Sequence, residues 1–188
     1  MKLQFVTSNQ IKFDSAAALL EPFDIKLERL EHDFIEIQAS GEQIARHKAQ
    51  AAFDFYQKPL IVSDDTWEIT ALGGFPGAYM HPINDWFTAD DWLRLMQGVQ
   101  DRRIVLRQHV VYQDERGQFY AVSDLEGVLL TQARGDSKYT NLTLISFTDG
   151  RTSRAEDIAA GGTMVGRESD TAWHKLGEQL TKSEPNRP

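Results

Sequence analysis

Apolar and polar positions follow two different periods along the first half of the chain. Residues 2–7 predict a first strand, and the short apolar run at 60–62 predicts a buried strand. In residues 24–30 apolar and charged side chains alternate, which predicts a strand with one exposed face. Residues 12–21 are expected to form a helix ended by a proline. Residues 40–58 carry apolar side chains on one helical face behind the capping-box pattern S-x-x-Q. Strands and helices are therefore expected to alternate.

The second half of the chain is richer in turns. A glycine and proline cluster at 73–77 predicts a loop, and Thr88 is placed to cap a helix that ends near Gly98. The turn at 114–117 favours a hairpin. The other expected elements are strands at 103–112, 118–124, 125–131 and 142–147, a last helix at 170–180, and a polar tail at 181–188. Both halves together predict an α/β protein with a mixed twisted sheet and flanking helices.

Composition narrows the class of protein. The chain has 188 residues, 41% apolar and 26% charged, which is enough for a real core and favours one domain or one two-lobed domain. A formal net charge of −8 disfavours unspecific binding to DNA, RNA or an anionic membrane. Because cysteine is absent, disulfide scaffolds, thiolate metal sites and cysteine nucleophiles are excluded. The longest apolar run, residues 16–20, is far too short to span a membrane, and a cytoplasmic protein is expected.

The first candidate site follows the first predicted strand. Thr7, Ser8 and Asn9 lie where this strand leads into a helix, and unpaired N–H groups at a helix N-terminus bind anions. Lys12 comes one turn later and is in reach of a phosphate group. The alternative is an ordinary strand-to-helix loop with an Asn turn and a surface lysine.

The second candidate site is the segment Ser63-Asp64-Asp65-Thr66, which directly follows the apolar run at 60–62. Ligands of open α/β sheets collect at the carboxyl ends of strands. Two adjacent carboxylates repel each other unless a cation compensates, and their oxygen atoms suit Mg²⁺. Mn²⁺ accepts the same ligands. The alternative is a solvated acidic turn.

Two further charged residues interrupt apolar patterns. Glu36 stands between Ile35 and Ile37 in the apolar run 34–37, which we interpret as a strand. It is either a third carboxylate for the same cation or a solvent-facing strand residue. Lys48 lies on the apolar side of the helix at 40–58. A lysine there either extends along the apolar surface to water or points into a cleft.

Four segments, taken in order, resemble motifs of the inosine triphosphate pyrophosphatase family, also called the Ham1 family. Residues 7–12 are similar to its T-x-N-x-x-K opening, and residues 42–52 to its lysine-bearing helix. Residues 62–66 are similar to its [A/E]-D-[D/T]-[S/T] segment. Residues 71–79 read A-L-G-G-F-P-G-A-Y, close to its A-L-G-G-x-P-G-x-Y loop. The resemblance extends over residues 1–112, and its last motif is long and specific.

The second half departs from this family. Arg134 and Gly135 match the start of its R-G-x-x-G-[F/W]-G-[Y/W]-D-P motif, but residues 136–143 differ from the rest. The S-H-R triplet that grips the purine has no recognisable counterpart; residues 169–171 are its nearest remnant. The candidates to replace the missing base contacts are Arg134, Lys138, Tyr139, Arg167 and Trp173.

The resemblance implies hydrolysis of a nucleoside triphosphate to the monophosphate and pyrophosphate with Mg²⁺ or Mn²⁺. Glu36, Asp64 and Asp65 would form the metal group, and Asp65 would also be the general base. Lys12 and Lys48 would neutralise charge on the triphosphate during catalysis. The implied substrate-binding residues are Thr7, Ser8, Asn9, Lys12, Lys48 and Thr66.

The resemblance also implies an architecture and a substrate. We expect one two-lobed domain over residues 1–180 with a central nucleotide cleft, and a homodimer with the 73–79 loop near its interface. The implied substrates are inosine and xanthosine triphosphate. Because of the altered second half, two alternatives stay open: the same chemistry on a different or modified nucleotide, and a nucleotide-binding protein with little turnover.

Overall fold

The computed structural model describes residues 1–162 and 170–182. The described residues divide into two compact units. The first unit contains residues 1–64, 108–123 and 170–182, and the second contains residues 65–107 and 124–162. No helix among these described residues is long and apolar enough to cross a membrane.

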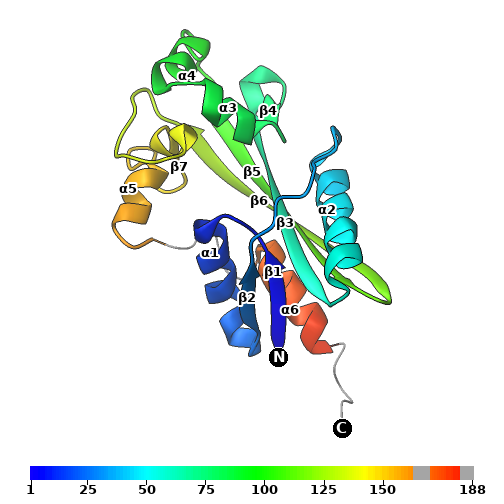
Figure 1. Cartoon of the computed structure of the whole chain (residues 1–188). Coiled ribbons are helices and arrows are strands. Elements are labelled where there is room, and N and C mark those ends of the chain that lie inside the picture. Colours follow the sequence, from blue (N-terminus) through cyan, green and yellow to red (C-terminus); the bar gives the residue numbers. More distant parts are fainter. Residues whose placement is uncertain (163–169, 183–188) are drawn as a thin grey trace. The chain divides into compact units, whose positions relative to one another are not determined.

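The elements alternate along the first half of the chain as its sequence pattern predicts (Figure 1). The first unit contains β1 (Lys2–Val6), α1 (Gln10–Leu20), β2 (Lys26–Leu30), α2 (Gly41–Tyr56) and α6 (Ala172–Lys182). Three long strands run through both units: β3 (Leu60–Ile69), β5 (Arg103–Asp114) and β6 (Gly117–Leu129). The second unit contains β4 (Pro76–Gly77), α3 (Met80–Trp86), α4 (Ala89–Leu95), β7 (Ile145–Ser146) and α5 (Arg154–Ala159). Short 3-10 helices lie at Glu21–Phe23, Thr70–Leu72 and Thr140–Thr143.

The strands form a mixed sheet in the order β2-β1-β3-β5-β6-β7, with β4 paired to β3. β1 is parallel to both β2 and β3, whereas β4 and β7 are antiparallel to their partners. Val6 of β1 pairs with Leu30 of β2 on one side and with Val62 of β3 on the other. The predicted fold class, a mixed sheet with flanking helices, is confirmed.

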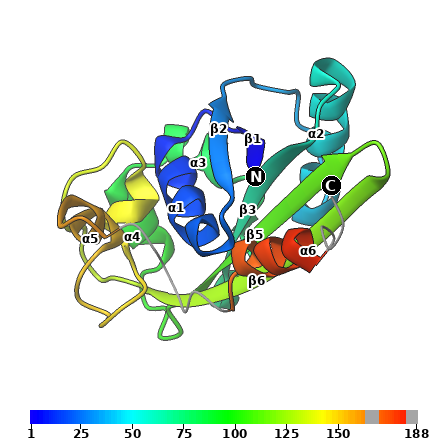
Figure 2. The same cartoon turned by 90° about the horizontal axis from the view of Figure 1, so that it is seen from below.

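Helices cover both faces of the sheet in the first unit (Figure 2). The ring of Phe5, fully buried in β1, packs edge-on against Trp173 of α6 at a centroid distance of 5.0 Å. The next residue, Val6, points to the other face and packs in a core cluster with Ala45 and Ala49 of α2. Alanine at these positions lets α2 approach the strands closely.

The second unit has its own core, which includes the end of β3, the start of β5 and the end of β6. Trp67 and Ile69 of β3 pack there with residues of α3, α4 and β5, and Trp92 of α4 is 3% exposed. The glycine-rich loop after β3 turns the chain back, so that β4 pairs with β3 through Trp67 and Gly77. Gly74 adopts a φ of +95° in this loop, which is favourable only for glycine.

Several predicted elements differ from the structure. Residues 34–37 form no strand, because the β1–β2 pairing ends at Leu30. β3 does not stop at Val62 but continues to Ile69, since its later residues enter the second core. The break expected near Asp124 is absent, and β6 is one strand across it.

The remaining differences concern short elements. The strand expected at 142–147 is a 3-10 helix followed by the two-residue strand β7. The helices α3 and α5 were not predicted. α5 begins with a capping box formed by Ser153 and Glu156, and the sequence pattern S-x-x-E is typical of this motif. The predicted tail lies mostly outside the described residues, apart from 181 and 182, which end α6.

Candidate functional site

The candidate phosphate loop lies at the carboxyl end of β1. The paired residues Val6 and Val62 directly precede Thr7 and Ser63, so the loop begins beside the acidic segment of β3. The amide of Thr7 donates to the carbonyl of Leu30 at 2.9 Å, which holds the loop to β2 as well. The first two candidate segments therefore begin on neighbouring parallel strands, but only the first lies at the carboxyl end of its strand, because β3 continues through the acidic segment to Ile69.

Asn9 organises the N-terminus of α1. Its side-chain oxygen accepts a hydrogen bond from the amide of Lys12 at 3.2 Å, and its own amide donates to the hydroxyl of Thr7 at 3.1 Å. The first turn of the helix contains no acidic side chain. Ser8 is exposed and Lys12 is half-buried. An eleven-residue helix whose N-terminus lacks negative side chains favours an anion there.

Lys48 connects the other candidate residues of the first unit. Its ammonium lies 2.7 Å from a carboxylate oxygen of Glu36 and 3.5 Å from one of Asp64. The side chain of Lys48 is 19% exposed and that of Asp64 is 13% exposed. These contacts decide between the two interpretations of Lys48. Its side chain lies against two carboxylates and does not extend to open solvent.

The structure changes the interpretation of the acidic pair. Asp64 and Asp65 lie in the middle of β3, where successive side chains point to opposite faces. Asp64 shares a face with Val62, which packs in the core cluster beneath α2, whereas half-buried Asp65 shares a face with Ile61. The pair is therefore divided between two faces. Thr66 is 5% exposed, and its hydroxyl donates to Glu68 at 3.3 Å.

The carboxylates of Glu36 and Asp64 fit a hard divalent cation. Both lie within ion-pair distance of the same ammonium, so their oxygen atoms converge on one place that already holds positive charge. Mg²⁺ is typically held by one or two protein carboxylates together with water and substrate phosphates. Among residues 1–162 and 170–182, no group of three or more His, Asp or Glu side chains is arranged to hold a metal ion.

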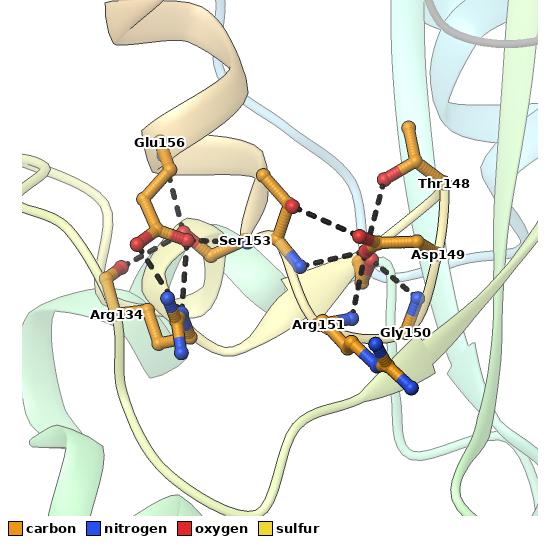
Figure 3. A network of polar contacts seen from close by, with 9 residues as sticks. Arg134, Thr148, Asp149, Gly150, Arg151, Ser153 and Glu156 are labelled. Atoms are coloured by element: carbon orange, nitrogen blue, oxygen red, sulfur yellow. Dashed lines mark hydrogen bonds and ion pairs between the residues drawn. The ribbon is translucent and has the colours of Figure 1, made fainter.

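Most candidates for base recognition have other contacts. Trp173 is 3% exposed and packs on Phe5, so it belongs to the core. The guanidinium of Arg134 donates to both carboxylate oxygens of Glu156, at 3.2 and 3.1 Å (Figure 3). The ammonium of Lys138 lies 5.6 Å above the ring centre of Tyr139. Arg167 and the start of the 169–171 remnant lie outside the described residues.

The Arg134 contact belongs to a network that fixes the N-terminus of α5 (Figure 3). The hydroxyl of Ser153 donates to the carbonyl of Arg134 at 2.8 Å, and its amide donates to Glu156 at 2.9 Å. The Ser153 amide, followed by Arg134, lowers the pKa of Glu156. In the same network, amides of Thr152 and Arg151 lower the pKa of Asp149 to about 2. These contacts give Arg134 a structural role.

Sequence reasoning missed polar groups on β5. Arg107 donates to the two carboxylate oxygens of Asp124 on β6, at 2.7 and 2.8 Å. His109 is 5% exposed, and its Nδ1 lies 2.8 Å from the hydroxyl of Tyr120. Arg107 and His109 lie two positions apart in β5, and this spacing, which puts them on one face of a strand, was available in the sequence.

Comparison with known proteins gives consistent matches. Residues 3–142 match the family described as the Ham1 family. A dITP/XTP pyrophosphatase of Ignicoccus hospitalis is 34% identical over 142 residues, which cover 73% of this chain and 75% of that protein. A dITP/XTP pyrophosphatase of Saccharolobus solfataricus is 28% identical over 137 residues, covering 72% and 71%.

Solved structures show the same fold. A HAM1 protein from Coxiella burnetii superposes with a TM-score of 0.77 at 17% identity, covering 97% of this chain and 99% of that one. The Ham1 protein of Staphylococcus aureus gives a TM-score of 0.76 at 16% identity, covering 98% and 100%. The fold therefore extends through the second half of the chain, although its residues depart from the motifs.

Proposed function

The chain belongs to the Ham1 family, and we propose that it hydrolyses a non-standard purine nucleoside triphosphate to the monophosphate and pyrophosphate. Its relatives are named dITP/XTP pyrophosphatases, so the enzyme class is a hydrolase of triphosphate anhydride bonds. The observation that carries the proposal is the pairing of Val6 with Val62, since the loop and the acidic segment begin directly after this pair.

The anion-binding half of the proposed site is the N-terminus of α1. Thr7, Ser8 and Asn9 would bind phosphate oxygens through backbone amides and hydroxyls, and Lys12 would add positive charge. The hydrogen bonds of Asn9 to Thr7 and Lys12 hold this loop in one conformation before the substrate arrives. A loop that is already ordered loses less conformational entropy on binding.

Glu36 and Asp64 would hold the divalent cation, Mg²⁺ or Mn²⁺. When bound, the cation neutralises phosphate charge and lowers the pKa of bound water. Asp65 points to the other face of β3, and we assign to it proton removal from the attacking water rather than a place among the ligands. Lys48 would bind the triphosphate. Buried Thr66 holds Glu68 through its hydroxyl, which supports a positioning role rather than direct substrate contact.

The experiment is a pyrophosphate-release assay with Mg²⁺ on inosine, xanthosine, standard and modified triphosphates. Release confined to inosine and xanthosine triphosphates supports the proposal. Release from another nucleotide alone retains the reaction and changes the substrate. If no triphosphate is hydrolysed but one raises the melting temperature, the protein is a nucleotide-binding protein instead.

Asp64→Asn and Asp65→Asn form a matched pair, because the same substitution is made at neighbouring positions of one strand. Both should abolish pyrophosphate release. Asp64→Asn should also weaken Mn²⁺ binding, measured by electron paramagnetic resonance, whereas Asp65→Asn should bind Mn²⁺ like the wild type. Full activity of Asp65→Asn would show that another group removes the proton.

We also propose that the protein is a homodimer that uses the exposed face of α3. Tyr79, the N-cap of α3, and Trp86, its last residue, are 50% and 73% exposed. Large exposed aromatic side chains are typical of interaction surfaces. A nucleotide substrate supports a cytoplasmic location.

The continuity of β3, β5 and β6 through both units supports one domain over residues 1–180.

A further inference from the structure

Lys48 occupies the place where the two proposed metal ligands converge. Its ammonium lies 2.7 Å from Glu36 and 3.5 Å from Asp64, and these three side chains come from the loop before α2, from α2 and from β3. The three groups carry a formal charge of −1 together. A divalent cation cannot bind both carboxylates at typical metal–oxygen distances of about 2.0–2.6 Å while the ammonium remains between them.

The two carboxylates differ in how readily they can release the lysine. Asp64 is 13% exposed, fixed in the middle of β3, and lies at the longer distance from the ammonium. Glu36 is 47% exposed, lies in a segment without regular structure, and makes the shorter contact. Because the Glu36 carboxylate is exposed to solvent, its ion pair with Lys48 is the weaker-held one, and an incoming divalent cation can replace the ammonium there at modest free-energy cost.

We infer that Lys48 is an internal counter-ion that the divalent cation displaces, and that the displaced ammonium becomes available to the triphosphate. This inference rests on the proposed function, because it assigns Glu36 and Asp64 to the cation. Lys48 thereby lowers the affinity for metal alone. In the free protein the ammonium offsets one of the two negative charges, and it joins the substrate only when the metal has arrived.

The first test measures binding of Mn²⁺ alone by electron paramagnetic resonance. Lys48→Met removes the competing charge while keeping a long apolar side chain, and should bind Mn²⁺ at least about fivefold more tightly than the wild type. Lys48→Arg retains the charge and should stay near the wild-type affinity. Unchanged or weaker binding in Lys48→Met, with an unaltered circular dichroism spectrum, overturns the inference.

A double variant locates the ion. Adding Glu36→Gln to Lys48→Met should abolish the gain in Mn²⁺ affinity. If the tighter binding persists, the ion lies elsewhere and the inference is wrong.

A second test uses the wild-type protein and so does not depend on the folding of a variant. Acetylation of lysine amines, followed by peptide mass spectrometry, reports how accessible each ammonium is. Saturation with Mg²⁺ should raise the acetylation rate of Lys48 at least about threefold, because breaking an ion pair frees the amine. Lys2, which pairs with Glu28, is the internal reference and should not change. A constant or falling rate at Lys48 overturns the inference.

Pyrophosphate release by the wild type is measured separately, so the two failures are distinguishable. If pyrophosphate is released but Mn²⁺ affinity does not rise in Lys48→Met, only the displacement is wrong. If the displacement is found and no triphosphate is hydrolysed, the displacement stands and the proposed function is wrong.

Discussion

Replacing Asn9 by aspartate exchanges one amide for a carboxylate of nearly equal size at the N-terminus of α1. In the wild type, the Asn9 side-chain oxygen accepts from the Lys12 amide at 3.2 Å, and a carboxylate oxygen can accept the same bond. Asp and Asn are about equally good N-caps, and negative charge at a helix N-terminus is favourable. The free energy of unfolding should therefore change by only a few tenths of a kcal/mol. Removing the cap in Asn9→Ala should cost about 1 kcal/mol and lower the Tm by about 2–4 °C.

The same carboxylate should repel the anion that we propose to bind there. Two unit charges about 4 Å apart repel by about 1 kcal/mol in bulk water and by about 4 kcal/mol near a protein surface. Even the lower value weakens binding roughly fivefold, and the midpoint of the range weakens it more than tenfold. Asn9→Asp should thus retain its stability and lose affinity for tripolyphosphate, which isothermal titration calorimetry measures in metal-free buffer.

The control is the cap of a helix in the other unit. The Thr88 hydroxyl accepts from the amide of Asp91 at 3.3 Å at the N-terminus of α4, so Thr88→Ala should lose stability like Asn9→Ala. It should bind tripolyphosphate like the wild type. The reasoning is refuted if Asn9→Asp binds the anion as tightly as the wild type, or if Thr88→Ala weakens it equally.

Three further predictions test packing, electrostatics and assembly. Gly177→Ala should destabilise by about 1–3 kcal/mol in urea unfolding, because the added methyl would lie 2.3 Å from a ring carbon of Phe23; a stabilised variant would show that helix propensity outweighs this clash. Because the pKa of Asp149 is lowered to about 2, chiefly by the Thr152 amide, its carboxylate stabilises the fold above the ordinary value of 3.8, and this contribution disappears as the pH falls to about 2. The stability difference between wild type and Asp149→Asn should shrink over that window, and a constant difference would contradict the assignment. Trp86→Ser should halve the mass measured by light scattering; an unchanged dimer mass, or a monomeric wild type, would exclude the α3 interface.

The elements that could be predicted are those whose signals lie within a few residues of each other. The capping box at Ser40 and the helical face behind it specify α2, and alternation specifies β2. Local patterns do not show which core a residue will join. β3 continues beyond Val62 because Trp67 and Ile69 are buried in the core of the second unit. That core is formed with residues distant in sequence, so the local pattern does not show it. The same cause makes β6 continuous at Asp124, where Arg107 of the neighbouring strand binds its carboxylate.

The sequence singled out the candidate side chains but not the contacts between them. Residue types indicated phosphate and cation chemistry at Asn9, Lys48 and Asp64. That Lys48 bridges Glu36 and Asp64 depends on how the loop before α2 lies against β3, which no period in the sequence encodes. Arg134 illustrates the opposite case: its charge favoured a ligand contact, whereas its guanidinium is committed to Glu156.

Continuation of β3 through the acidic segment directs its two neighbouring carboxylates to different faces of the strand, on which their different proposed roles depend. At the end of a strand, Asp64 and Asp65 could both turn toward one cation. In the middle of a strand the hydrogen-bonded backbone fixes the directions of both side chains. Asp64 then points to the same face as Val62, and Asp65 points to the same face as Ile61. Of the two, Asp64 lies in contact with Lys48, and proton removal by Asp65 is the role we propose for the second carboxylate. If both were ligands, Asp64→Asn and Asp65→Asn would weaken Mn²⁺ binding alike, so the strand geometry itself is tested by their difference.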